Sequence, residues 1–146
     1  MNRFALLALA LLLAPLAHAG QTSATMQVSA RVVASCAVSA DDLRFPDYTS
    51  GGPAVHQNAD VRLRCTKGAP ATVYVDGPQV LTSKDGTPLA YAVHTPAGAP
   101  WTSTAGVAVL GQGIAPVALP LAGTIAAGQR VAPGDYQGEV LVRVVY

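Results

Sequence analysis

The last eleven residues of the chain alternate apolar and polar side chains, and this pattern constrains the fold more than any other feature. In residues 136–146 the apolar positions of one parity are Tyr136, Val140, Val142, Val144 and Tyr146, whereas Gln137, Glu139 and Arg143 lie on the other. A period of two is typical of a strand with one buried face. A strand at the end of a chain leaves a row of N–H and C=O groups that invites pairing. The sequence therefore predicts that the apolar face of the final strand forms part of an acceptor groove, and that the missing partner comes from another molecule.

A second alternating stretch lies near the opposite end of the chain. Its apolar or small residues are Met26, Val28, Ala30, Val32, Ala34, Cys36 and Val38. At about 3.3 Å per residue this stretch spans roughly 40 Å, about twice the length of a typical strand. It is predicted to form two strands, or one strand that leaves its own domain. The alternative is a long first strand that bends and switches sheets within one complete sandwich.

The N-terminus has the features of a secretory signal peptide. A short positive region with Arg3 precedes an apolar run at residues 4–13, and Ala17-His-Ala19 is a small-x-small cleavage pattern. We expect cleavage after Ala19, and an apolar run this short is a poor membrane span. The remaining residues, 20–146, suffice for one domain and are too few for two.

The charge balance argues against a nucleic-acid partner. Without Arg3, the nine basic and eight acidic residues of the chain balance to a formal charge of zero. Binding to nucleic acid requires a basic face. No later stretch is apolar enough to cross a bilayer, so we expect no membrane span after the signal peptide is removed.

The chain has two cysteines, Cys36 and Cys65. In an exported chain an even pair is most simply one disulfide. Closing a loop of this size removes unfolded-state entropy worth roughly 3 to 4 kcal/mol. A metal or redox role is disfavoured because there is no C-x-x-C motif, and the exported part retains only His56 and His94, which are far apart in sequence.

The middle of the chain reads as short strands separated by Gly and Pro. The expected strands cover residues 61–65, 71–75, 80–82, 89–93 and 117–121, with Ile125 beyond the last. Pro116 and Pro120 flank or interrupt the strand at 117–121, which predicts an edge position for it. No stretch of residues 20–146 shows sustained helical periodicity. This spacing of strands and turns predicts an antiparallel β-sandwich of immunoglobulin-like type.

Residues that could carry catalysis are sparse, so we expect neither an enzyme nor a bound cofactor or metal. The exported part has a single glutamate, Glu139, on the expected outer face of the last strand. Asp41 and Asp42 are neighbours in a predicted loop, where carboxylates are more often solvated than paired for acid–base work. The sequence Gly111-Gln-Gly113 lacks the third glycine of a dinucleotide-binding loop, and there is no G-x-S-x-G motif.

With these patterns in view, the chain resembles the spore coat protein U domain family, the exported β-sandwich subunits of archaic chaperone-usher pili. The stretches that carry the resemblance are, in order, Ser35-Cys-Ala-Val38, Val61-Arg-Leu-Arg-Cys-Thr-Lys-Gly68, Leu89-Ala-Tyr-Ala-Val-His-Thr95 followed by Trp101, Gly123-Thr-Ile-Ala-Ala-Gly-Gln129, and Pro133-Gly-Asp-Tyr136 with the closing strand. The resemblance covers nearly all of residues 20–146.

The resemblance implies an incomplete immunoglobulin-like sandwich that is completed by donor-strand exchange. In this family a periplasmic chaperone lends a strand, and an outer-membrane usher then replaces it with the N-terminal extension of the next subunit. Residues 20–33 would be that extension and residues 34–146 the sandwich domain. The donor side chains would be Met26, Val28, Ala30 and Val32. A slip of one residue would instead bury polar neighbours such as Gln27 and Arg31, so the register is enforced.

The resemblance also implies the function. The chain would be a structural subunit of a bacterial surface fibre, passing through the periplasm and pairing with identical or related subunits, the chaperone and the usher. The alternative is a surface or tip-located adhesive module that binds a ligand through the loop at residues 96–101. His94, close in sequence to Tyr91 and Trp101, could mark such a binding patch, although a lone histidine at a strand end is more often structural.

Overall fold

The computed structural model of this chain describes residues 20–146, so the predicted signal peptide, residues 1–19, lies outside the described residues. Every regular element in the described part is a β-strand. The strands are β1 (Cys36–Ala40), β2 (Val55–Cys65), β3 (Pro70–Asp76), β4 (Val80–Ser83), β5 (Pro88–Ala90), β6 (Ala92–His94), β7 (Val107–Leu110), β8 (Val117–Ile125), β9 (Tyr136–Gln137) and β10 (Leu141–Val145). Residues 20–35 contain no strand. The predicted all-β class is confirmed.

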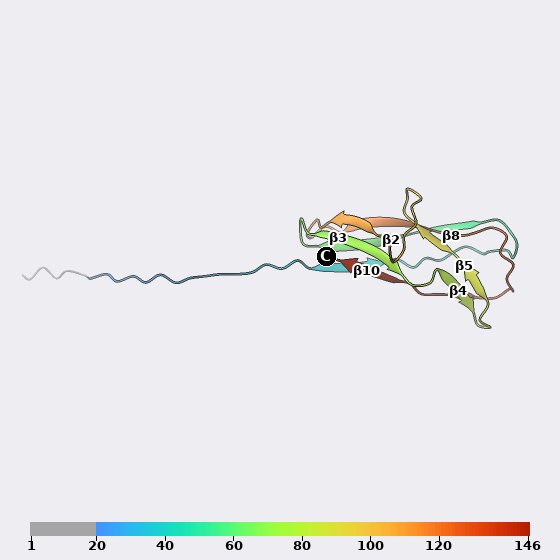
Figure 1. Ribbon diagram of the computed structural model, residues 1–146, viewed down its shortest axis with the longest axis horizontal. Coiled ribbons are helices and arrows are strands. Elements are labelled where there is room, and N and C mark those ends of the chain that lie inside the picture. Colours follow the sequence, from blue (N-terminus) through green and yellow to red (C-terminus); the bar gives the residue numbers. More distant parts are fainter. Residues whose placement is uncertain (1–19) are drawn as a thin grey trace, which may run out of the picture. The chain divides into compact units, whose positions relative to one another are not determined.

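The strands form three open antiparallel sheets (Figure 1). The largest has the order β1-β2-β8-β6, the second has the order β10-β3-β7, and the third has the order β5-β4-β9. In the first sheet β2 pairs with β8 over nine residues, which makes these two long strands its centre. The first two sheets are the layers of the predicted sandwich, and neither sheet closes on itself.

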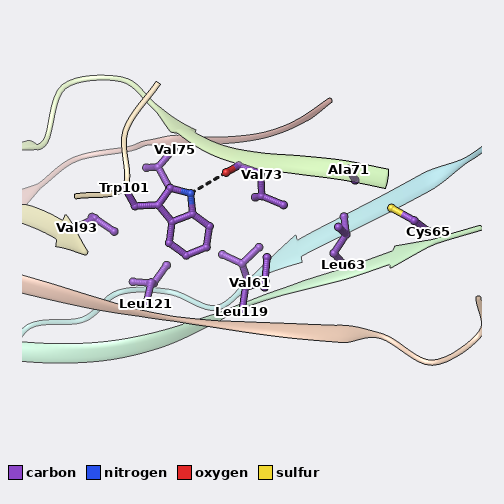
Figure 2. Close-up of a cluster of buried hydrophobic side chains, with 10 residues drawn as sticks. All are labelled: Val61, Leu63, Cys65, Ala71, Val73, Val75, Val93, Trp101, Leu119 and Leu121. Atoms are coloured by element: carbon purple, nitrogen blue, oxygen red, sulfur yellow. Dashed lines mark hydrogen bonds between the residues drawn. The ribbon is translucent and has the colours of Figure 1, made fainter. Parts of the chain in front are cut away.

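The hydrophobic core lies between the first two sheets and follows the alternation of their strands. Its buried members are Val61, Leu63 and Cys65 of β2, Ala71, Val73 and Val75 of β3, Val93 of β6, Leu119 and Leu121 of β8, and Trp101 (Figure 2). Trp101 is only 1% exposed, and its indole Nε1 donates a hydrogen bond to the carbonyl oxygen of Val73 at 2.8 Å. A buried indole N–H needs such a partner. Trp101 is therefore a core residue and not part of a surface binding patch.

The disulfide predicted from the cysteine pair is present. Cys36 and Cys65 are bonded and lie directly opposite each other in the ladder between β1 and β2. At the other end of this ladder, Arg62 donates two hydrogen bonds to the carboxylate of Asp41, at 2.6 and 2.9 Å. Both ends of the first strand are thus fastened to β2.

Two predicted strands are each divided between two sheets. The stretch at 89–93 becomes β5 and β6, and the stretch at 136–146 becomes β9 and β10. In the second case the chain crosses from one sheet to another at Gly138, where a Cβ would lie 2.7 Å from the carbonyl oxygen of Val80. Only glycine permits this close approach of two backbones. The final residue, Tyr146, lies after the end of β10.

The edge position predicted for residues 117–121 is wrong for the strand as a whole. These residues begin β8, which lies between β2 and β6. However, β6 pairs only with Ala122, Gly123 and Thr124. Pro120 pairs with β2 on one side and lies outside the part of β8 that pairs with β6, so its missing N–H interrupts no ladder there.

Candidate functional site

Two of the edge strands of the sandwich, β1 and β10, lie next to each other. Among the strands of the described chain, β1 pairs only with β2, and β10 pairs only with β3. The two edge strands are neighbours in space but are not hydrogen-bonded to each other (Figure 1). The sandwich is therefore open along the line between β1 and β10.

The inner face of β1 is only partly covered. In an antiparallel ladder, residues that lie opposite each other project to the same face. Val38 of β1 lies opposite Leu63, and Ala40 lies opposite Val61. Leu63 and Val61 are buried, whereas Val38 is 41% exposed and Ala40 is exposed. The side of β1 that faces the core thus lacks cover.

The inner face of β10 has the same deficiency. Val142 lies opposite Val75, and Val144 lies opposite Val73. Val73 and Val75 are fully buried, whereas the two valines of β10 pack against the core and remain only half-buried. The apolar stripe along β10 is completed by Val140, which packs against the same core.

The five residues predicted to line an acceptor groove are placed in three different ways. Val140, Val142 and Val144 lie together on the core side of the open edge. Tyr136 is half-buried in β9, and its hydroxyl donates a hydrogen bond to the carbonyl oxygen of Ala132 at 2.8 Å. Tyr146 is 61% exposed beyond the end of β10. The structure thus groups the three valines and does not bring Tyr146 to them.

A cleft of about 1150 Å³ lies beyond the ends of these two edge strands. One wall is formed by residues 42–50, which follow β1, and the other by residues 131–139, which precede β10. The lining also includes Leu81, Leu89 and Ile125, of which the last two are buried. Because each wall continues one of the open strands, the cleft and the uncovered faces of β1 and β10 form one groove. We call this the open groove.

The first wall of the open groove is packed against the sandwich. A Cβ on Gly123 of β8 would lie 2.6 Å from Cδ2 of Leu43 and 2.9 Å from Cζ of Phe45, so only glycine leaves room for these two side chains. The ring of Phe45 also meets that of Tyr91 edge to face at 5.7 Å. This burial raises the pKa of Tyr91 through loss of solvation.

Hydrogen bonds of Tyr48 and Gln129 hold the far end of the same wall. The hydroxyl of Tyr48 accepts a hydrogen bond from the backbone N–H of Gln129 at 2.8 Å and donates to the carbonyl oxygen of Ala126 at 3.1 Å. The side-chain amide of Gln129 in turn bonds both the N–H and the C=O of Ala90, at 2.9 and 2.8 Å. This wall is thereby fixed in place without being part of a sheet.

Two carboxylates that follow β1, those of Asp41 and Asp42, are paired with arginines at the surface. The hydrogen bond from Arg62 lowers the pKa of Asp41, and Asp42 forms an ion pair with Arg44 at 2.7 Å. Nowhere in residues 20–146 do three His, Cys, Asp or Glu side chains gather so that they could hold a metal ion. The open groove thus combines uncovered apolar side chains on β1 and β10 with unpaired strand edges, and the cleft at its end is lined by polar as well as apolar residues. Unpaired edges beside an apolar face are suited to binding an extended chain.

The side chains predicted to act as donors are exposed. Met26 is 81% exposed, Val28 is 85% exposed and Val32 is 88% exposed, and Ala30 is also exposed. They lie in residues 20–35, which contain no strand.

Sequence reasoning missed the first wall and the lining from the third sheet. The signal for the wall was present, because Leu43 and Phe45 alternate with Asp42 and Arg44. The contribution of residues such as Leu89 depends on a sheet pairing that the local pattern does not reveal. Residues 20–146 contain no helix that is long and apolar enough to span a membrane.

Comparisons with known proteins agree with this architecture. A family model described as the Spore Coat Protein U domain matches residues 22–143. No match is found among curated proteins. Among solved structures, a similar fold occurs in the CsuC–CsuE chaperone–tip adhesion subunit pre-assembly complex from the archaic chaperone-usher Csu pili of Acinetobacter baumannii. The similarity has a TM-score of 0.57 at 23% identity and covers 79% of this chain but only 40% of that chain.

Proposed function

The chain belongs to the Spore Coat Protein U domain family, and we propose that it is a non-catalytic structural subunit of a bacterial surface fibre. After export, a periplasmic chaperone covers the open groove, and an outer-membrane usher exchanges the chaperone strand for the N-terminal segment of the next subunit. The finished polymer lies at the cell surface. Its partners are identical or related subunits.

The observation that carries this proposal is the uncovered inner face of both edge strands. A strand inserted between β1 and β10 would pair with their free N–H and C=O groups and cover Val38, Val142 and Val144. Pairing with both edges and covering these valines together require an extended segment with apolar side chains at every second position. A globular ligand would supply neither the ladder nor the alternation.

Residues 26–32 provide such a segment. Met26, Val28, Ala30 and Val32 share one parity, so all four would face the core in a single register. Burying the methionine and the two valines would contribute roughly 1.5 to 3 kcal/mol each before the entropy of ordering is counted. The segment is thus chemically matched to the open groove.

Pairing in trans is favoured over pairing in cis by the residues that join the segment to β1. To fold back beside its own β1, the chain would have to turn within Val33, Ala34 and Ser35. Tight hairpin turns need residues that tolerate positive φ, chiefly Gly, Asn and Asp. This linker contains none of them. The donor segment therefore reaches a neighbouring molecule more readily than its own groove.

The test uses a chain that lacks residues 20–33, produced together with its chaperone. We expect this chain to keep the Cys36–Cys65 disulfide, and we expect its thermal midpoint to rise when a peptide covering residues 21–35 replaces the chaperone. The matched control is the same peptide with Val28→Lys and Val32→Lys, which should give no rise. If the native peptide also gave no rise, a self-contained sandwich would be the better description.

The alternative, a ligand-binding module, is weakened because Trp101 lies in the core and is not available to contact a ligand. The two functions predict different solution behaviour. A fibre subunit should give a ladder of heat-labile oligomers in cold detergent, whereas a binding module should give a monomer whose stability depends on its ligand.

A further inference from the structure

Two strongly exposed aliphatic side chains lie at the end of β7 and on the turn that joins β7 to β8. Ile114 is 91% exposed, and Leu110, at the end of β7, is 59% exposed. Single exposed apolar residues are common on protein surfaces. Two such residues only four positions apart, outside the open groove, call for a physical explanation.

This turn is rigid. The N–H of Gly113 donates to the carbonyl oxygen of Cys65 at 2.9 Å, and the N–H of Gly111 donates to that of Ala69 at 2.9 Å. A Cβ on Gly111 would collide with the backbone of Thr66, so this close approach requires glycine. Ile114 is therefore held at a fixed position beside the Cys65 end of β2.

The donor segment leaves the sandwich at the same end. The backbone N–H of Ser35 donates to the side-chain Oγ1 of Thr66 at 3.0 Å, and the N–H of Thr66 donates to the carbonyl oxygen of Ser35 at 2.9 Å. Only three residues, Val33 to Ser35, separate Val32 from Cys36. Four Cα-to-Cα steps span at most about 14 Å. If Val32 occupies a neighbour's groove, that neighbour must lie within this distance of Cys36, whose disulfide partner Cys65 accepts the hydrogen bond from Gly113 of the turn.

We propose that Leu110 and Ile114 pack against the next copy of this chain, as a second contact beside the inserted strand; the inference rests on the proposed function. A short tether alone would let adjacent domains swivel about it. An apolar contact next to the tether restricts that motion and covers the two exposed side chains.

The pairing direction identifies the surface of the neighbour that is contacted. β10 runs toward the Cys36 end of the domain, because Val145 pairs with Thr72 near the start of β3. A donor strand antiparallel to β10, the commoner arrangement, runs away from that end. Val32 then lies at the cleft end of the neighbour's groove, where the exposed Pro46 and Pro133 line the two walls. These prolines are the apolar surface against which Ile114 would pack.

The test compares labelling of an introduced thiol in the polymer and in the monomer. An Ile114→Cys chain is purified both as polymer and as a chaperone-bound monomer, and its reaction rate with a maleimide is measured. We expect the rate in the polymer to fall roughly tenfold or more, as expected for a site that must open locally before it reacts. The control is Ala118→Cys, which is exposed on the outer face of β8 and should react equally in both states.

The outcomes separate this inference from the proposed function. A polymer in which the thiol introduced by Ile114→Cys reacts as fast as in the monomer would overturn the contact and leave donor-strand exchange intact. Absence of any polymer would remove the proposed function and this inference with it. As a second readout, Ile114→Lys should still allow the ladder of oligomers but give more flexible fibres than Gln112→Lys, a neighbouring substitution on the same turn. Equal flexibility of the two variants would also contradict the contact.

Discussion

Val38 and Leu63 lie opposite each other in the ladder between β1 and β2, yet Leu63 is 1% exposed and Val38 is 41% exposed. Both side chains face the core, so the difference arises from what lies on the far side of each strand. β2 has neighbours on both sides, whereas β1 has one. A missing strand is the simplest physical account, and the predictions below depend on it.

Val38→Glu should abolish the rise in thermal midpoint produced by the donor peptide. In the free domain the carboxylate can stay in water, but the inserted strand would bury it without a partner, at a cost of several kcal/mol. Peptide titration monitored by thermal unfolding measures this. Ser39→Glu is the matched control, because Ser39 faces outward opposite Arg62 and should leave the rise unchanged. Equal losses in both variants would point to general destabilisation.

Val28→Lys combined with Val32→Lys should eliminate the oligomer ladder. Both side chains would face the core in the inserted strand, and burying an unpaired ammonium group there is strongly unfavourable. Gel analysis in cold detergent without boiling is the measurement. Ser29→Lys adds the same charge on the opposite parity and should keep the ladder. A ladder that survived the double substitution would show that this segment is not the donor.

Replacing both Cys36 and Cys65 by Ser should lower the free energy of unfolding by about 3 to 4 kcal/mol, since the loop between them spans a separation of 29 residues. Urea unfolding of the peptide-bound domain measures the loss. The hydrogen bonds between Ser35 and Thr66 remain in this variant, so β1 should stay paired. A loss well below 1 kcal/mol would mean that those bonds alone constrain the first strand.

Acidification should weaken the domain partly through Asp76. The hydrogen bond from Arg143 holds the pKa of the Asp76 carboxyl below its ordinary value of 3.8. As the pH falls, the unfolded chain binds this proton before the folded domain does. The stabilising contribution is therefore fully present above the unfolded pKa and is lost as the pH falls through the lower folded pKa.

The measurement for this prediction is unfolding between about pH 5 and about pH 2. Asp76→Asn should flatten the pH dependence, because it removes the carboxyl group whose proton affinity differs between the two states. Asp85→Asn, in the exposed turn after β4, serves as the control and should retain the slope of the unaltered chain. A slope unchanged by Asp76→Asn would assign the acid sensitivity to other carboxylates.

Alternation in the sequence predicted most of the strands but not which sheet each strand joins. The stretch at 71–75 matches β3 because its apolar residues face a core on one side only. In contrast, the stretch at 136–146 was expected to be one strand and is divided at Gly138. The division depends on contact with Val80, more than fifty residues earlier, so no local pattern could reveal it. β7 was not predicted. Its four residues, Val107–Leu110, are all apolar or small, so they show no alternation between apolar and polar side chains.

The candidate site was predictable on one side only. The valines of β10 were evident from their spacing, and the cysteine pair correctly indicated the disulfide. The opposite wall, with Leu43 and Phe45, is irregular and is positioned by space left at Gly123 of β8. Such a wall arises from tertiary packing, which a single sequence does not display.

The position of the disulfide has a mechanical consequence. Any tension on residues 20–35 arrives at β1 through Cys36, the first residue of that strand. The covalent bond to Cys65 passes this load directly to β2, a central strand held on both sides. The ladder between β1 and β2 therefore cannot be peeled apart one rung at a time from its loaded end, and the domain resists being pulled by its N-terminal segment for as long as the sulfur–sulfur bond is intact.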